Sequence, residues 1–203
     1  MCALALASCA FAGTAPKPKA SDYPVQARVG DIDIAAAYLV HTLPAESTNF
    51  LVPDYLVVEV AIYPPKYQAV AASAGQFHLR VNGKKDVLAD TPEMVAMSLK
   101  YPHLGQKGLQ PQVGIGPVIL GREQPNERMP GDQRPSSGKA PDPDRPPPQT
   151  AAEAAIAQAF PDCPCQKAVS GYVYFRYDGR MKSIKSLELI WERGEEQSTI
   201  RLF

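Results

Sequence analysis

The sequence predicts a mainly β fold: an antiparallel β-sandwich of seven or eight strands with two short helices and a long proline-rich insertion. Three observations lead to this class. Apolar and polar residues alternate along several short segments, and turn dipeptides separate those segments. In addition, 21 of the 203 residues are proline, about twice the usual share of ~5%. Short strands at regular spacing with turn signals between them are typical of sandwiches.

Two long strands are expected first, in the segments IDIAAAYLV (32–40) and YLVVEVAIY (55–63). In the first, alternation predicts one shared face for Ile32, Ile34, Ala36, Tyr38 and Val40. In the second, Glu59 lies between valines, as expected for a sheet with one buried and one wet face. Pro64 and Pro65 end this strand, because proline cannot donate to the ladder.

A hairpin is predicted in QFHLRVNGKKDVL. Asn82-Gly83 is the dipeptide that supplies two positive φ angles for a two-residue type I′ turn. The alternation places Phe77 toward the core and His78 on the outward, solvated face.

Two short helices are expected on either side of the insertion. The first follows Thr91 as N-cap with Pro92 in its first turn, and the second opens with the capping box of Thr150 and Glu153. Between them, residues 105–149 hold ten prolines from Pro111 to Pro148 and few apolar side chains. We expect a mobile segment of polyproline character there.

The last strands are expected in GYVYFRY, SLELIW and QSTIRLF. In GYVYFRY, alternation puts Tyr172, Tyr174 and Arg176 on the outward face. Aromatic residues and arginine are enriched at protein contacts, so these three form a possible partner-contact face. The alternative is that the alanine-rich second helix covers them.

The chain is therefore divided into four segments. These are a leader and tether (1–22), the first part of the sandwich (23–104), the insertion (105–149), and a short helix with the remaining strands of the same sandwich (150–203).

The leader MCALALASCA contains LASC, which resembles the site of lipoprotein cleavage, and so predicts lipidation of Cys9. The apolar stretch is short and lacks a positive n-region, and we expect its upstream half to precede this sequence. Cleavage after Ala10-Phe11-Ala12 would instead release the protein. The protein is expected to be exported, as a periplasmic or outer-membrane-anchored lipoprotein or alternatively as a secreted one. A cytosolic N-terminus is the remaining alternative.

Charge and hydropathy narrow the class of partner. Lys and Arg together number 21, as do Asp and Glu, so no net field favours nucleic acid. No apolar run reaches the ~18–20 residues of a membrane-spanning helix, so no transmembrane helix is expected.

The sequence contains none of the motifs G-x-S-x-G, H-E-x-x-H or G-x-x-x-x-G-K-[ST]. Gly114-Ile-Gly116 begins like a dinucleotide loop, but Ile119 stands at the third glycine position. The three histidines (His41, His78 and His103) show no ligand spacing. The pair Met94 and Met97 fits a helix that packs on a core better than a soft-metal site. No enzyme activity, cofactor or metal is predicted.

Cys163-Pro164-Cys165 is the motif with the most chemical potential. In an oxidising compartment two thiols this close tend to pair, although a bridge across one residue is tight. An internal disulfide, free or intermolecular thiols, and a metal or redox function all remain open.

Taken together, YLVVEVAIY, FHLRVNG, SGYVYFRYDG and LELIW resemble the strands of exported bacterial immunoglobulin-like sandwich proteins, which are often lipoproteins of unknown function. The resemblance covers roughly residues 25–90 and 168–203. It implies an immunoglobulin-like fold and a non-catalytic binding protein whose partner is an envelope protein or a glycan. The alternative is a periplasmic metal-binding or thiol-redox protein that uses the two cysteines of Cys163-Pro164-Cys165.

Overall fold

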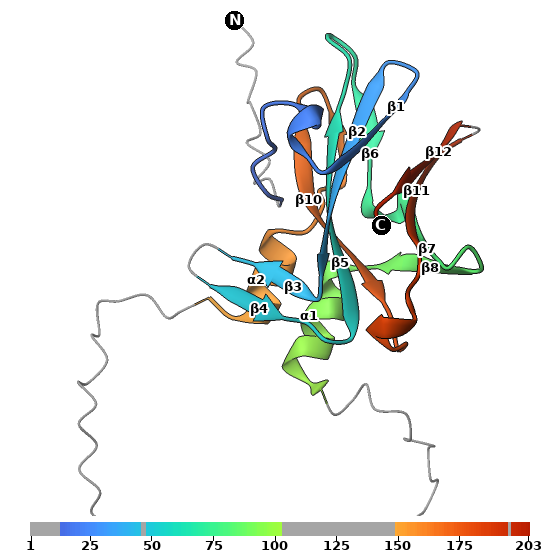
Figure 1. The fold of residues 1–203 in the computed structure, drawn as a ribbon. Helices are drawn as coiled ribbons and strands as arrows, with labels where there is room; N and C mark the ends of the chain where they lie inside the picture. The colour runs from blue at the N-terminus through green and yellow to red at the C-terminus, as the bar shows by residue number, and fades with distance from the viewer. Residues whose placement is uncertain (1–12, 46–47, 103–148, 195) are drawn as a thin grey trace, which may run out of the picture.

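The computed structural model of the protein describes residues 13–45, 48–102, 149–194 and 196–203 (Figure 1). An antiparallel sheet of eight strands dominates it. These strands are β1 (Val25–Val29), β2 (Ile32–Val40), β5 (Tyr55–Tyr63), β7 (Phe77–Val81), β8 (Lys85–Asp90), β10 (Val169–Arg176), β11 (Leu187–Arg193) and β12 (Glu196–Arg201). The predicted mainly β, antiparallel class is confirmed.

Shorter elements complete the fold. The strands β3 (Thr42–Pro44) and β4 (Asn49–Leu51) form one pair, and β6 (Val70–Ala72) and β9 (Cys163–Cys165) form another. The two helices are α1 (Pro92–Lys100) and α2 (Ala151–Ala157), and single 3-10 turns occur at Ala20–Asp22, Ala74–Gln76 and Met181–Ser183. Strands of three residues carry too little alternation to be predicted from sequence.

Both helices begin as their sequences predict. The Thr91 side chain accepts a hydrogen bond from the backbone of Met94, with Pro92 in the first turn. Thr150 and Glu153 form a reciprocal capping box, and this contact lowers the pKa of the Glu153 carboxyl.

The two layers of the sandwich are halves of one continuous sheet, with the strand order β1-β2-β5-β10-β8-β7-β11-β12. Most of β8 pairs with β7, but Ala89 and Asp90 pair with β10, so β8 belongs to both layers. The sheet curls until its edge strands β1 and β12 lie side by side. Two edges that face each other are shielded from pairing with other chains.

The core fills the space between the two layers. Alternate residues of β5 and β10 meet alternate residues of β7 and β11 there, and Phe77 packs edge-on against Phe160. The largest fully buried side chains of this core include Phe77, Leu79, Phe175, Leu189 and Trp191.

The inward face of β2 departs from the prediction at its end. Ile32, Ile34 and Ala36 are buried in the core, but Val40 is 42% exposed. The register with β5 shifts between Tyr38 and Val40, and Val40 has φ 63°. This irregularity turns Val40 out of the alternation.

The β7–β8 hairpin is confirmed, but its turn is longer than predicted. Val81 pairs with Lys85, which leaves three residues in the loop, and both Asn82 and Gly83 have positive φ. The Asn82 side chain accepts from the backbone N–H of Lys185 (2.6 Å) and donates to Ser183 O (2.9 Å). These contacts to the β10–β11 connection favour the longer turn.

Candidate functional site

An N-terminal segment, residues 13–23, lies across the outward side of β5 and β10; we call it the strap (Figure 1). The backbone nitrogen of Gly13 donates to Ala157 O and that of Thr14 donates to Ser170 O, both at 2.9 Å. Thr14 forms an antiparallel bridge with Ser170. The strap therefore extends the sheet by one residue beside β10.

Residues 13–22, which the sequence analysis assigns to the leader and tether, contact the folded domain in the structure. The Tyr63 hydroxyl donates to Lys17 O at 2.7 Å, and Lys17 Nζ lies 4.5 Å from the centre of the Tyr23 ring. Tyr23 and Ala20 are buried against β2 and β5. The proline-bearing composition suggested a free linker, but specific contacts attach this segment to the domain.

Gly13 is required where the strap begins. Its φ is +127°, and a Cβ at this position would lie 2.5 Å from Ser170 O. Residues with side chains rarely adopt such a φ, and the carbonyl belongs to β10 and cannot move freely. A glycine is therefore needed for the strap to reach the sheet.

A polar cluster lies beneath the strap. The Ser170 hydroxyl, 2% exposed, donates to Thr14 O at 2.9 Å, and the two hydroxyl oxygens are 2.7 Å apart. Glu59 accepts from the Thr14 hydroxyl at 3.4 Å and from the Tyr23 hydroxyl at 3.5 Å. Glu59 thus faces outward as predicted, but the strap lies over it.

Burial raises the pKa values of the two tyrosines at this cluster, Tyr172 and Tyr23. Burial raises the pKa of Tyr172 to about 12, and the neighbouring Glu59 carboxylate adds to the rise. Burial also raises the pKa of Tyr23, opposed by its hydrogen bond from the Lys17 backbone. Both phenols stay protonated and act as hydrogen-bonding groups at neutral pH.

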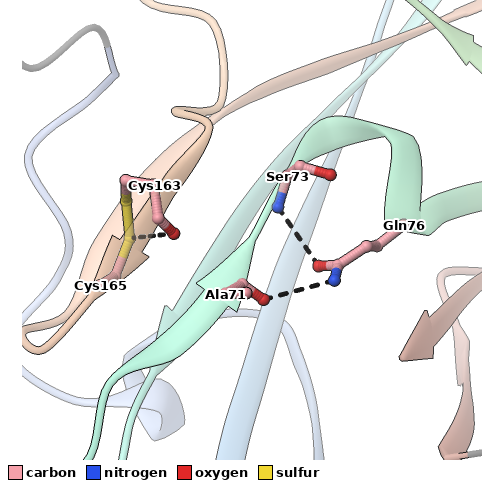
Figure 2. Close-up of a disulfide and its surroundings, with 5 residues drawn as sticks. All are labelled: Ala71, Ser73, Gln76, Cys163 and Cys165. Atoms are coloured by element: carbon pink, nitrogen blue, oxygen red, sulfur yellow. Dashed lines mark hydrogen bonds between the residues drawn. A yellow bond between two sulfur atoms is a disulfide. The ribbon is translucent and has the colours of Figure 1, made fainter. Parts of the chain in front are cut away.

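The two cysteines of Cys163-Pro164-Cys165 are joined by a disulfide within β9 (Figure 2). Residues two apart in a strand lie on the same side of it, and here the Cα atoms are 5.4 Å apart. This arrangement is one of the three that the sequence left open. Cys163 is half-buried, Cys165 is 4% exposed, and Pro164 between them is exposed.

Strand β6, which pairs with β9, is held without help from the disulfide (Figure 2). The Gln76 Oε1 atom accepts from Ser73 N at 3.2 Å and from Trp191 Nε1 at 3.4 Å. Its Nε2 atom donates to Ala71 O at 3.3 Å. Gln76 therefore connects β6 to the core tryptophan of β11.

The disulfide encloses a very short loop, with a sequence separation of two. In the chain-entropy model a three-residue loop gives about 1.6 kcal/mol, compared with about 3 kcal/mol for a fifteen-residue loop. A bridge this local constrains the unfolded chain weakly. Stabilisation of the fold is therefore a poor explanation for it.

A groove of about 440 Å³ separates the strap from the cysteine loop, residues 161–168. Its walls include Thr14 and Pro16 on the strap side and Pro161, Pro164, Cys165 and Lys167 on the loop side. Its volume is in the range of small-ligand and peptide sites. The strap thus both covers the sheet and forms one wall of the groove.

The predicted partner-contact face is largely covered. Tyr172 is 7% exposed and Tyr174 is 1% exposed, and the Tyr174 hydroxyl donates to Ala155 O of α2 at 3.0 Å. Only Arg176 is exposed. Helix α2 packs on this face through its alanines, so the alternative, that the second helix covers this face, is correct. Tyr172 and Tyr174 are therefore not available to a partner.

The two histidines within the described ranges, His41 and His78, have separate neighbours. His41 Nδ1 lies 2.6 Å from Tyr55 O, and His78 Nε2 lies 3.8 Å from a Glu192 carboxylate oxygen. The His78 side chain is only 14% exposed, so the expectation of a solvated histidine is wrong. Its register neighbours in the flanking strands are Leu88 of β8 and Ile190 of β11.

The helix α1 does not bury its methionines. Met94 and Met97 are 54% and 59% exposed, while Val95 and Ala96 are buried. The expected packing of the methionine pair is wrong, because α1 presents a different side to α2 and β5. Among the described residues, no three His, Cys, Asp or Glu side chains are grouped to hold a metal ion.

Several predictions fall on residues outside the described ranges. These are the leader with Cys9, most of the insertion 105–149, the glycine segment at Gly114 and Gly116, and His103. Within the described ranges, the helices are too short or too polar to cross a membrane.

The sequence reasoning missed the strap and the cluster of Thr14, Glu59 and Ser170. One signal was present: the outward positions Ala35 and Ala37 on β2 and Ala61 on β5 are all small. Small side chains leave room for a covering segment, whereas a solvated strand face has no such need.

Comparisons with protein-family models, with curated proteins and with solved structures returned no match. The class that the fold itself defines is a mainly β protein with one curled, eight-stranded antiparallel sheet. Its function is therefore argued from its own residues.

Proposed function

We propose that this protein is exported and lipid-anchored through Cys9, and that its β-sandwich binds a partner at the bacterial envelope without catalysing a reaction. The partner is an envelope protein or a glycan. The alternating strands, the LASC leader and the absence of the catalytic motifs searched for in the sequence support this class.

The observation that carries the proposal is the attachment of the strap. Gly13 and Thr14 are bonded to the domain, and Cys9 precedes Gly13 by four residues. Four extended residues span at most about 14 Å. A lipid on Cys9 would therefore hold the domain close to the membrane and not at the end of a long tether.

The same attachment affects what faces the membrane. Thr14 and Pro16 line the groove beside the cysteine loop. A domain anchored just before Gly13 would carry this groove near the bilayer surface, where a partner in the envelope can reach it.

Secretion without a lipid is the second candidate, and one observation favours it. Cleavage after Ala12 would make Gly13 the first residue of the mature protein. The nitrogen of Gly13 already donates to Ala157 O at 2.9 Å, so a new amino terminus there would keep its hydrogen-bond acceptor.

The test is the chemical identity of the mature N-terminus. The gene, with its own upstream region, is expressed in a bacterial host with labelled palmitate, and the N-terminal peptide is identified by mass spectrometry. We expect acylated Cys9 in the membrane fraction, and loss of label in Cys9→Ser. A mature chain that starts at Gly13 would replace the lipoprotein proposal by secretion, and an uncleaved cytosolic chain would contradict both.

The binding function is tested separately by crosslinking in intact envelopes. The full chain is compared with a chain that lacks residues 112–148. Partners captured by both would bind the sandwich, and partners lost with the deletion would bind the insertion. No specific crosslink with either chain would contradict a binding role.

A further inference from the structure

We infer that the Cys163–Cys165 disulfide is a thiol–disulfide exchange site that accepts electrons from a cysteine pair in an extended polypeptide. This inference does not depend on lipidation of Cys9, and it goes beyond the proposed binding role by adding an exchange reaction at one disulfide. It begins from a disulfide that the stability of the fold does not explain.

The disulfide is dispensable for the local architecture. Strand β9 is paired with β6 at all three of its positions, and Gln76 ties β6 to Trp191. The bridge closes only a three-residue loop. Its reduction should leave these backbone and side-chain contacts in place.

The two sulfurs differ in access. Cys163 is half-buried beside the exposed Pro164, whereas Cys165 is 4% exposed and lies in the wall of the groove. An incoming thiolate therefore reaches the Cys163 sulfur, and Cys165 is the leaving group. Disulfides with an accessible sulfur exchange more readily than fully buried structural ones, and here only the Cys163 end lies outside the fully buried class.

The groove supplies favourable surroundings for this step. Lys167 and Cys165 both line it, and a cation in the same groove as the leaving sulfur favours the departing thiolate. Among the described strands, β9 pairs only with β6, so its other edge is open to an extended peptide. Prolines 16, 161 and 164 add apolar walls for such a segment.

The exchange balances in two steps. A substrate thiolate attacks the Cys163 sulfur, the bond to Cys165 breaks, and Cys165 leaves as a thiolate while a mixed disulfide forms. The second substrate thiolate then attacks its neighbour in that mixed disulfide and releases Cys163. Two electrons pass to the cysteine pair, which becomes a dithiol after taking up two protons, and the substrate becomes a disulfide. A more oxidising disulfide is needed to restore the pair.

The test uses the folded, oxidised full-length protein in native buffer. It is mixed either with reduced glutathione or with a short peptide that carries two cysteines, then quenched in acid, alkylated and mapped by mass spectrometry. We expect a mixed disulfide on Cys163, dithiol and oxidised peptide in equal amounts, and an unchanged far-ultraviolet circular dichroism spectrum. Reaction with glutathione but not with the peptide would overturn the assignment of a polypeptide substrate.

Matched variants locate the chemistry. Cys165→Ser should accumulate a stable adduct on Cys163 when given oxidised glutathione, and Cys163→Ser should accumulate much less on the buried Cys165. Lys167→Gln should slow exchange severalfold with the fold unchanged. Exchange only in denaturant, unfolding on reduction, or equal adducts on Cys163 in Cys165→Ser and on Cys165 in Cys163→Ser would each overturn the inference.

Discussion

Strands β5 and β10 present one outward face, and two different segments cover it. Toward the Tyr55 end, α2 covers an apolar cluster that contains Tyr174 and Val57. Toward the Tyr63 end, the strap covers the polar contacts of Glu59 and Ser170. The same outward face is thus covered by a helix over apolar side chains at one end and by the strap over polar side chains at the other.

The two covering segments differ in the free energy needed to detach them from the sheet. Removing α2 would expose fully buried aromatic and aliphatic surface, which is the main source of folding free energy. The strap buries Ala20 and Tyr23, and its other contacts are hydrogen bonds, each with a net contribution of about 1 kcal/mol. We therefore expect the helix-covered half to unfold only with the whole domain, and the strap to open locally.

The largest effect is expected for Tyr174→Ala in the helix-covered half. The residue is 1% exposed, so its truncation should lower the free energy of unfolding by about 3–5 kcal/mol. Tyr174→Phe removes only the bond to Ala155 O and should cost about 1 kcal/mol. Urea unfolding followed by the fluorescence of Trp191 measures both. Equal losses in the two variants would mean that packing under α2 is not the main contribution.

A smaller and local effect is expected for Gly13→Ala in the strap-covered half. The added Cβ would lie 2.5 Å from Ser170 O, and the strap should detach before the sheet distorts. Hydrogen exchange of the Thr14 amide should rise by about tenfold or more, equivalent to about 1.4 kcal/mol.

A matched control for this variant is Gly83→Ala. Gly83 also has positive φ, but nothing lies within 4 Å of an added Cβ there. It should weaken the β7–β8 turn and leave the Thr14 amide unchanged. A strap that stays protected in Gly13→Ala would contradict the assignment of local opening.

A third effect, absent at neutral pH, appears only in alkali, at the boundary between the two covers. Tyr172 packs in the helix-covered cluster, and the Glu59 carboxylate also acts on it. Its burial raises its pKa to about 12, above the ~10 of a tyrosine in the unfolded chain. The folded state therefore holds this proton more tightly. The resulting stability is complete below pH 10 and is lost as the pH rises through 12.

Urea midpoints measured between pH 8 and the alkaline limit test this dependence. The midpoint should fall above pH 10, and the fall should be shallower in Tyr172→Phe. A fall of equal size in the variant would assign the effect to other tyrosines, of which Tyr174 and Tyr63 also have pKa values raised by burial.

Much of the local structure could be predicted because its causes lie within a few residues. Alternation identified the inward faces of β5 and β10, and the capping residues Thr91 and Thr150 marked both helix starts. Methionine positions were misjudged, because the spacing of Met94 and Met97 fits either side of a short helix. The side of α1 that is buried is the one with Val95, which lies in the same apolar cluster as Ala154 and Val57.

What the sequence by itself determined is most of the longer strands, the places where the chain turns and the helix caps, since each depends on side-chain period or on one turn of backbone. Only the tertiary structure decided what covers the outward face. Thr14 meets Glu59 across 45 residues of chain and Ser170 across 156. No local pattern encodes such pairings, because they depend on how the sheet curls and on which surfaces its small side chains leave open.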